Sequence, residues 1–322
     1  MLPVSIIVPA WNEEKVLSKT FQALGGVDYE REKSELIVVA GGEDKTYEVA
    51  KDLAGLKHPF SRNIVIPQEG RGTKNAAIQQ GIREAKNPVI VLLDADTIVS
   101  PRWLTQLVEP IERGECDLAI ANSEPIRRNW VSDYFMIIKT SSAEEITTYP
   151  GHSLALRADI VLRDVDHFFD ESIWMGDDYM LVTRVKEAGG NTMFVRSALV
   201  KTHFPCSLRY FIKIETKWLT AFINFNGVNP RTLLKSTVIM ASLLTLMPFS
   251  WILFTGSLVF HGAYVGKKLK MFRLAAKQYE TKTIRLFGFI FLSYLYHVLN
   301  LAAHIRYFLG MWQDSYYQGQ RG

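Results

Sequence analysis

The sequence predicts an α/β fold, in which a doubly wound, mainly parallel sheet is followed by C-terminal membrane helices. Before residue 100, short runs rich in Val, Ile and Leu alternate four times with helix-like segments. Such alternation is typical of parallel sheets with right-handed crossovers. The run at 89–93, VIVLL, is continuous, as expected for a strand buried on both faces. The last third of the chain carries two long uncharged stretches.

Composition narrows the class of protein. A chain of 322 residues accommodates one large domain or two moderate ones. The formal net charge is +4, with Lys and Arg denser toward the C-terminal third, which favours an anionic membrane surface over a nucleic acid as partner. Cys116 and Cys206 indicate neither a disulfide framework nor a zinc site. The N-terminal segment lacks the basic region of a signal peptide, so we expect the globular part in the cytoplasm.

The predicted elements follow from local patterns. β-branched runs predict strands at 4–8, 36–39, 64–66 and from 89 onward. Asn12 is expected to cap a first helix that carries Glu13 and Glu14 in its first turn. That helix ends at Gly25 and Gly26. Further helices are predicted at about 46–53 and 74–85.

The loops between these elements exclude two common nucleotide-binding classes. No G-x-G-x-x-G follows the first strand, which argues against a dinucleotide dehydrogenase. No G-x-x-x-x-G-K-[ST] occurs anywhere, so a P-loop is also excluded. The first strand is followed instead by PAWNEE at 9–14.

Two carboxylates, Asp94 and Asp96, follow the strand that begins at Val89. The carboxyl end of a strand in an open α/β sheet is where ligands bind. Like charges this close repel each other unless a proton or a cation lies between them. A divalent metal that also binds phosphates would resolve the repulsion. A solvated acidic turn is the alternative, and these residues alone leave both open.

Several motifs together resemble the family 2 glycosyltransferases. Their order and spacing carry the resemblance, which extends to about residue 220. The motifs are Pro9-Ala10-Trp11-Asn12-Glu13-Glu14, Asp94-Ala95-Asp96, Gly151-His152-Ser153 through Arg157, and Gly176-Asp177-Asp178 with Leu181 and Arg184. The resemblance implies the A-type glycosyltransferase (GT-A-like) fold and a nucleotide-diphospho-sugar donor, a UDP- or GDP-sugar.

On the donor side, the resemblance implies that Asp96 ligates Mg²⁺ or Mn²⁺ and that Asp94 faces the ribose or the metal shell. His203 is a further candidate metal ligand, with a histidine that caps a strand end as the alternative. Arg71 and Lys74 lie on a glycine-bearing loop and are expected to neutralise phosphate charge. Both are otherwise solvated loop cations.

The segment after the first strand resembles the family's nucleoside-binding loop, which begins at Pro9. Trp11 is expected against the base or ribose, with a packing role as the alternative. Glu13 is expected to accept hydrogen bonds from the nucleoside, or else only to serve the helix start. Ala40 stands where many family members carry an acid that reads the base. Glu43 or its neighbour Asp44 is the predicted replacement.

For the acceptor side, the resemblance makes Asp178 the general base, with Asp177 in the position usually held by Glu. A simple helix cap is the alternative for this pair. The loop Gly151-His152-Ser153 and Trp218 are expected near the acceptor. Trp218 ends IETKW, where processive relatives carry Gln-x-x-Arg-Trp, so transfer of one sugar is expected. An anionic phosphate acceptor needs no base, so the acidic pair favours a hydroxyl acceptor.

The uncharged stretches are 237–266, with Pro248 near its centre, and 286–305. Each exceeds or matches the roughly 20 residues needed to cross a hydrocarbon core. Two buried helices of a soluble domain are the alternative, and the number of spans stays open. The basic loop between the stretches is expected on anionic lipid headgroups. We therefore expect a catalytic domain at 1–230 and a membrane-associated helical region at 231–322.

The sequence leads to one functional hypothesis and two alternatives. The hypothesis is an integral cell-membrane enzyme with a cytoplasmic catalytic domain, an inverting, metal-dependent glycosyltransferase. It would move one sugar from a nucleotide sugar to a lipid-linked or glycan acceptor. One alternative is a catalytically silent relative that acts as a membrane scaffold or partner subunit. The other is a haloacid-dehalogenase-type phosphatase with Asp94 as nucleophile.

Overall fold

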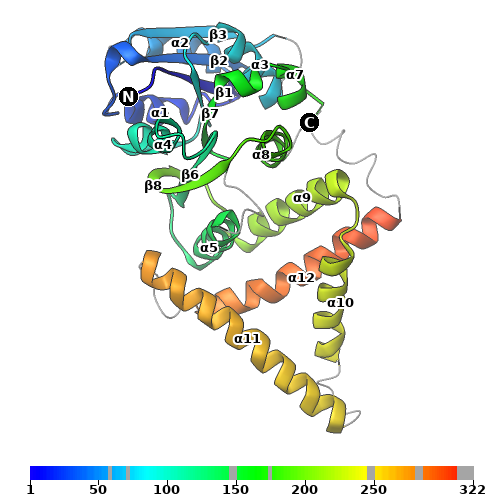
Figure 1. The fold of residues 1–322 in the computed structure, drawn as a ribbon. Coiled ribbons are helices and arrows are strands. Elements are labelled where there is room, and N and C mark those ends of the chain that lie inside the picture. The colour runs from blue at the N-terminus through cyan, green and yellow to red at the C-terminus, as the bar shows by residue number, and fades with distance from the viewer. Residues whose placement is uncertain are drawn as a thin grey trace. The chain divides into compact units, whose positions relative to one another are not determined.

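The computed structural model describes residues 1–56, 60–69, 73–144, 151–172, 176–244, 251–279 and 286–309. Their contacts divide the chain into two compact units. The sheet unit comprises Met1–Ile126 and Ile138–Phe204. The helical unit comprises Arg127–Ile137 and the chain from Pro205 onward. Figure 1 shows the elements of both units in chain order. The functional division expected at residue 230 stays a prediction.

The described part of the sheet unit contains one mixed sheet of eight strands, in the order β3-β2-β1-β4-β7-β6-β8-β5. Its strands are β1 (Val4–Trp11), β2 (Ser34–Gly41), β3 (Arg62–Pro67), β4 (Val89–Leu93), β5 (Ile98–Val99), β6 (Leu118–Pro125), β7 (Ser153–Arg157) and β8 (Thr192–Thr202). The four strands β3, β2, β1 and β4 pair in parallel, as the alternating pattern predicts. β7 runs antiparallel to both β4 and β6. The predicted doubly wound α/β sheet is confirmed.

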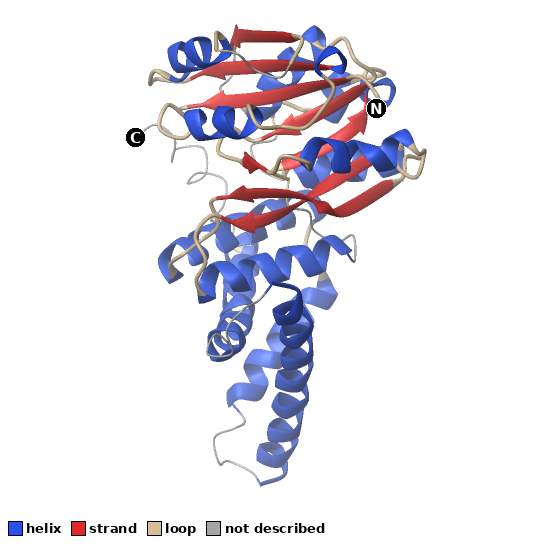
Figure 2. Cartoon of the chain, turned by 90° about the vertical axis from the view of Figure 1, so that its left-hand side faces the viewer, coloured by secondary structure: helices blue, strands red, loops and turns tan. Residues whose placement is uncertain are grey.

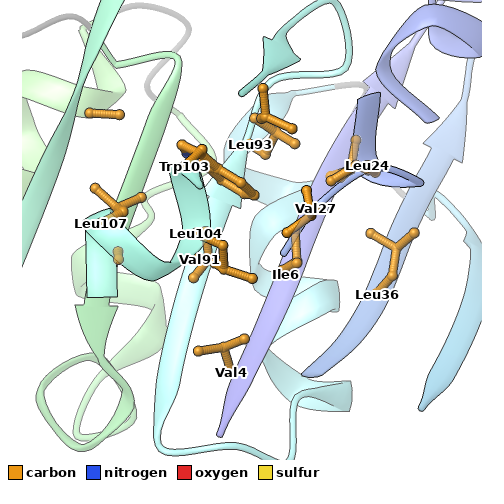
Figure 3. Packing of buried hydrophobic residues seen from close by; sticks show 14 of the residues in the cluster. Val4, Ile6, Leu24, Val27, Leu36, Val91, Leu93, Trp103, Leu104 and Leu107 are labelled. Atoms are coloured by element: carbon orange, nitrogen blue, oxygen red, sulfur yellow. The ribbon is translucent and has the colours of Figure 1, made fainter. Parts of the chain in front are cut away.

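Helices cover both faces of this sheet (Figure 2). They are α1 (Leu17–Leu24), α2 (Thr46–Ala54), α3 (Lys74–Glu84), α4 (Trp103–Glu112), α6 (Ala158–Val161), α7 (Val165–Phe168) and α8 (Asp177–Glu187). Alternate residues of β1 enter different cores: Val4 and Ile6 pack with α1 and α4, whereas Ile7 packs with α3. Figure 3 shows the first core, in which Trp103 lies fully buried above β4. The two cores hold β1 and β4 rigidly beneath the loops at their carboxyl ends.

The first helix differs from its prediction. α1 begins at Leu17, and Asn12 does not cap it. Asn12 instead adopts a left-handed backbone with φ of 60°, and its side-chain oxygen accepts a hydrogen bond from the backbone amide of Glu43. An N-cap residue needs an extended backbone and a side chain free to reach the following amides. Asn12 meets neither condition, because its backbone is left-handed and its side chain is already hydrogen-bonded to the loop after β2.

The helical unit contains the first part of α5 (Trp130–Glu144), and α9 (Leu208–Asn226), α10 (Pro230–Leu244), α11 (Trp251–Tyr279) and α12 (Leu286–Phe308). The uncharged stretch 237–266 is divided between α10 and α11, and Pro248 lies outside the described residues. Among the described helices, only the segment Gly288–Phe308 of α12 has the length and composition needed to cross a membrane. Thus one of the two predicted membrane stretches retains support as a single span.

Gly81 of α3 offers a test of the core beneath the site. A Cβ at this position would meet the Ile7 side chain 2.5 Å away, far inside van der Waals contact. We expect Gly81→Ala to lower the unfolding free energy by about 1–3 kcal/mol through overpacking, although Ala is normally the better helix residue. Chemical denaturation measures this change.

The double variant Gly81→Ala/Ile7→Ala supplies the control for that prediction. Because Ile7→Ala removes the atoms that clash, the two substitutions should cost less together than the sum of their separate effects. An unaltered or increased stability of Gly81→Ala alone would contradict the packing described for α3.

Candidate functional site

The acidic pair lies at the carboxyl edge of the sheet, as predicted. Asp94 follows β4 directly, and its backbone amide donates a hydrogen bond to the His152 carbonyl just before β7. Asp96 accepts a hydrogen bond at 3.5 Å from the hydroxyl of Thr202, the last residue of β8. Because β7 runs antiparallel, its beginning meets the end of β4. Segments distant in sequence therefore converge at one edge.

The segments after β1 and β2 are joined by hydrogen bonds from backbone amides to side-chain oxygens. The Glu43 amide donates to Asn12 Oδ1 at 2.7 Å, and the Glu13 amide donates to Thr46 Oγ1 at 2.6 Å. Gly42 between them has a φ of 120°, and a Cβ there would collide with the Asn12 side chain. These contacts fix the path of the segment that the sequence assigned to the nucleoside. Glu43 itself is exposed.

Trp11 lies against the second loop rather than inside a core. A Cβ on Gly41 would come within 2.8 Å of the Trp11 ring, so the ring lies directly over the glycine backbone. Even so, Trp11 is 40% exposed. Trp11 therefore packs against the second loop and still exposes part of its ring. Pro9, two residues earlier, is half-buried in β1.

Negative charge concentrates around Glu13. Burial, and then the charges of Asp96 and Asp94, raise the pKa of Glu13 from 4.5 to about 7. Burial likewise raises the pKa of Asp94 to about 6, although Lys74 beside it acts in the opposite direction. Glu13 and Asp94 thus resist ionisation because they are buried and because their neighbours are also acids.

Lys74 connects this acidic cluster to a second one. Its ammonium Nζ lies 2.6 Å from Asp94 Oδ1 and 3.3 Å from Asp177 Oδ2. Burial alone would lower the pKa of Lys74, but Asp177 and Asp94 outweigh it and hold that pKa above its usual value. The lysine begins α3, where the hydroxyl of Thr73 caps the helix. A residue predicted to bind phosphate therefore bridges Asp94, predicted for the donor side, and Asp177, predicted for the acceptor side.

Asp178 lies deeper than Asp177, with 6% of its surface exposed. Gly176 precedes α8 with a left-handed backbone, φ of 74°. A Cβ on Gly151 would collide with the Asp178 carboxylate, so the two lie in direct contact. Burial and the charge of Asp177 raise the pKa of Asp178 to about 7. A carboxyl group poised near neutral pH suits proton transfer.

The other residues that the sequence assigned to the site lie in several separate parts of the chain's structure. Ser153 is fully buried and accepts a hydrogen bond from the Trp103 indole at 3.1 Å. The His152 ring lies 3.0 Å from the hydroxyl of Ser123. His203 is exposed, next to the buried Thr202. Trp218 belongs to α9 of the helical unit. Arg71 lies outside the described residues.

Two polar residues at the site were missed by the sequence analysis. The sequence analysis named His203 as a candidate ligand but did not name the adjacent Thr202. Asn75, beside Lys74, lines a small cavity together with Gly151, Asp177 and Asp178. Its side-chain oxygen is buried without a hydrogen-bond partner in the described residues, while its amide nitrogen donates to the Asp170 carbonyl. The only sequence signal for Asn75 was its place after Lys74.

The donor set suits a hard cation. Asp94, Asp96 and Glu13 offer only oxygen atoms, and their mutual repulsion would be relieved by positive charge. The described residues contain no group of three His, Cys, Asp or Glu side chains placed to hold an ion together. Mg²⁺ commonly binds through one or two carboxylates with substrate phosphates and water. The residues present fit that mode, and His203 stays a predicted ligand.

Comparison with known proteins identifies the family. The sequence model described as glycosyl transferase family 2 matches residues 5–169, and a second, glycosyl transferase family group 2, matches residues 89–305. The chain belongs to glycosyl transferase family 2. Both models include Asp94 and Asp96, so the phosphatase alternative is not retained.

Individual relatives agree with this assignment. The probable glycosyltransferase YdaM of Bacillus subtilis is 24% identical over 231 residues, covering 67% of this chain and 54% of that protein. The dolichol-phosphate mannosyltransferase of Pyrococcus furiosus is 32% identical over 125 residues, covering 38% and 33%. The chain thus spans about half or less of these relatives' lengths.

A solved structure shares the GT-A-like fold. The mannosyltransferase PcManGT from Pyrobaculum calidifontis, in complex with GDP-Man and Mn²⁺, aligns with a TM-score of 0.60 at 18% identity. The alignment covers 98% of this chain and 88% of that one. At this identity the likeness establishes the fold, and the predicted fold class is confirmed.

Substitution of Asp178 by Asn is expected to stabilise the substrate-free protein at high pH. The folded state keeps the Asp178 proton up to about pH 7, whereas the unfolded chain loses it near 3.8. Wild-type stability therefore falls as pH rises between these values. Asn carries no such penalty, so the variant should be more stable at pH 8 by about 2–4 kcal/mol, at about 1.4 kcal/mol per pKa unit.

Thermal unfolding between pH 4 and pH 8 measures this difference, which should vanish near pH 4. Asp159→Asn is the matched control, because Arg157 lowers the pKa of the half-exposed Asp159. Loss of the Asp159 carboxylate in this variant should slightly destabilise the protein at pH 8. An Asp178→Asn variant that unfolds below wild type at pH 8 would contradict the buried, repelled carboxyl described here.

Proposed function

We propose that this chain is an inverting, metal-dependent glycosyltransferase that moves one sugar from a UDP- or GDP-sugar to a membrane-proximal acceptor. One observation carries the proposal: Lys74 bridges Asp94 at the end of β4 and Asp177 at the start of α8. A donor-side acidic pair and an acceptor-side acidic pair thereby share one edge of the sheet. Glycosyl transfer to a hydroxyl acceptor requires such a pairing of leaving-group stabilisation with proton removal.

On the donor side, the joined loops would hold the nucleoside. The exposed ring of Trp11 offers a stacking surface, and Glu13 would accept hydrogen bonds from the ribose or base. Asp96, with Asp94, would hold Mg²⁺ or Mn²⁺, which supplies Lewis-acid stabilisation of the leaving diphosphate. The Mn²⁺ in the Pyrobaculum mannosyltransferase supports this choice. Lys74 would orient Asp94 by its hydrogen bond at 2.6 Å.

On the acceptor side, Asp178 would take the proton of the attacking hydroxyl. Its pKa of about 7 favours this role, because a base works best when its pKa lies near the working pH. Gly151 leaves room for the Asp178 carboxylate, with which a Cβ at this position would collide. Attack on the anomeric carbon from the side opposite the diphosphate would invert its configuration. The incomplete polymerase motif at Trp218 supports the addition of a single sugar.

We further propose that the acceptor is lipid-linked or another glycan at the cytoplasmic face of the cell membrane. The apolar segment Gly288–Phe308 of α12 supports membrane association. The Pyrococcus relative is named for dolichol phosphate, a lipid phosphate acceptor. The acidic pair at Asp177 and Asp178 favours a hydroxyl on such a lipid-linked molecule, since a phosphate is already an anion.

Removal of divalent metal is expected to abolish sugar transfer, and added Mn²⁺ or Mg²⁺ should restore it. Asp96→Ala should lower kcat at least about a hundredfold, which corresponds to roughly 2.7 kcal/mol of transition-state stabilisation. Its residual activity should no longer respond to metal. Release of UDP or GDP from a panel of nucleotide sugars is the measurement.

Glu109→Ala is the control for that experiment, because Glu109 lies on the surface of α4 beside Arg113, away from the β4 edge. Equal behaviour of Asp96→Ala and wild type would refute the metal assignment. An absence of turnover in both, across the panel and with metal present, would favour the scaffold alternative instead.

Substitution of Asp178 is expected to lower the transfer rate to two classes of acceptor by different amounts. Asp178→Asn should slow transfer to a hydroxyl acceptor by roughly 10²–10⁴, the usual contribution of a general base. Transfer to a polyprenyl phosphate should be much less affected, because that acceptor needs no deprotonation. Radiolabelled sugar transfer to each acceptor measures the effect. A variant that keeps full activity with a hydroxyl acceptor would exclude Asp178 as the base.

A further inference from the structure

Asn75 is a buried polar residue of the site to which the proposed reaction assigns no role. It lies in the first turn of α3, and only 2% of its surface is exposed. Its side chain donates a hydrogen bond to the Asp170 carbonyl at 2.8 Å, and because a carbonyl only accepts, this bond fixes which end of the amide is the nitrogen. Asn75 Oδ1 is therefore a hydrogen-bond acceptor, and it is buried without a partner in the described residues. Such a group is costly and requires an explanation.

Gln79, one turn further along α3, is a side chain of the same kind that is fully paired. Its amide nitrogen donates to the Phe169 carbonyl at 2.7 Å. Its oxygen accepts a hydrogen bond from the Arg83 guanidinium at 3.0 Å. Both amides therefore tie α3 to the segment 169–170, but of the two only Asn75 has an oxygen without a partner. The tie to this segment explains the nitrogen of Asn75 and leaves its oxygen unexplained.

The cavity beside Asn75 lies within the sheet unit and is small. Its volume is about 10 Å³, roughly the space that one water molecule or one hydroxyl group needs. Apart from Gly151, its wall consists of apolar side chains and four polar residues, which are Lys74, Asn75, Asp177 and Asp178. Asp170 does not line the cavity, so the oxygen is the end of the Asn75 amide that is left to face it.

The polar groups around this cavity are rich in hydrogen-bond acceptors and poor in donors. The ammonium of Lys74 is already held by two carboxylates. Asp178 Oδ1 accepts a hydrogen bond from the next backbone amide at 2.9 Å, whereas Asp178 Oδ2 lies against Gly151 and accepts none within the described part of the chain. Asn75 Oδ1 and Asp178 Oδ2 therefore both require a donor. The two protons of one water molecule suffice for both in the substrate-free protein.

A substrate that replaces this water has to supply the same two donors. The attacking hydroxyl has a single proton, which passes to Asp178 in the proposed reaction, so it cannot also donate to Asn75. A second donor on the substrate satisfies Asn75 Oδ1, and a substrate without one leaves this buried oxygen unpaired. Because the cavity holds about one small group, the second donor has to lie directly beside the attacking hydroxyl.

We propose that Asn75 selects substrates in which a second hydroxyl stands on the carbon next to the attacking hydroxyl. Neighbouring hydroxyls of this kind occur on sugar rings, so the substrate class is a glycan or a glycolipid with a free vicinal diol. An isolated alcohol leaves Asn75 Oδ1 without a donor. This inference rests on the proposed function, in which Asp178 receives the proton of the attacking hydroxyl, and it narrows the sugar-accepting molecule from any alcohol to a diol.

The test uses the full chain in lauryldimethylamine oxide, a detergent without hydroxyls, with Mn²⁺ and a nucleotide sugar that the protein turns over. Three amphiphiles are compared as substrates: hexadecane-1,2-diol, 2-fluorohexadecan-1-ol and hexadecan-1-ol. Fluorine is close to a hydroxyl in size but donates no hydrogen bond. Mass spectrometry of the extracted glycolipids gives kcat/KM for each. In wild type we expect the diol to exceed both other alcohols by about ten- to a hundredfold.

Asn75→Leu is the informative variant, because it removes the buried oxygen with little change of shape. Its kcat/KM values for the three alcohols should agree to within about threefold, since no unpaired oxygen remains to distinguish them. Gln79→Leu is the matched control. It removes the same kind of amide and a bond to the neighbouring Phe169 carbonyl, at a position that does not line the cavity. This control should keep the wild-type preference for the diol.

Equal kcat/KM for the diol and the fluoroalcohol in wild type would overturn the proposal and assign the cavity to a structural water only. This comparison needs no variant to fold. A diol preference that Asn75→Leu retains, or that Gln79→Leu loses, would also overturn it, as would an active enzyme that transfers no sugar to the diol. All these results leave donor turnover intact. An absence of turnover with every nucleotide sugar would instead refute the proposed function, and this inference with it.

Discussion

The repulsion among carboxylates at one edge of the sheet is the constraint on which the site depends. Asp94, Asp96 and Glu13 crowd one side, and Asp177 and Asp178 crowd the other. Burial and neighbouring charge together raise the pKa values of Glu13, Asp94 and Asp178. Among the residues that the structure describes, the ammonium of Lys74 touches both sides. The folded protein thus keeps an excess of negative charge that only protons or cations relieve. Such tension is typical of sites that bind charged substrates.

Most of the sheet unit could be predicted from its sequence because the signal is local. Runs such as Val89–Leu93 are continuous and apolar, and they do become central strands. The position of Asp94 and Asp96 at a strand end followed from the same run. The conformation of Asn12 could not be predicted, because it depends on an amide donated from Glu43, a contact between distant loops. The bridge made by Lys74 depends in the same way on α8, a hundred residues later in the chain.

The helical unit shows the limit of composition as a guide. Uncharged stretches indicated membrane association, yet they said nothing of which polar groups would be satisfied. His297 and His304 look alike in the sequence, since each stands alone among apolar neighbours. Only the contacts distinguish them: Ser236 and Tyr264 complete His297, whereas His304 bonds to its own helix and has no partner for its other nitrogen among the described residues. Hydrogen-bond polarity is a property of geometry, which residue types do not encode.

The antiparallel return of β7 has a consequence for the synthesis of the protein. The parallel strands β3, β2, β1 and β4 are complete once the ribosome has passed Leu93, but the free edge of β4 stays open until Ser153–Arg157 emerges. An apolar strand with an unpaired edge is a template for association with other chains. The nascent protein therefore passes through an interval in which its most hydrophobic strand is exposed to neighbours. Closure by β7 ends that hazard and, in the same step, brings the His152 carbonyl to Asp94.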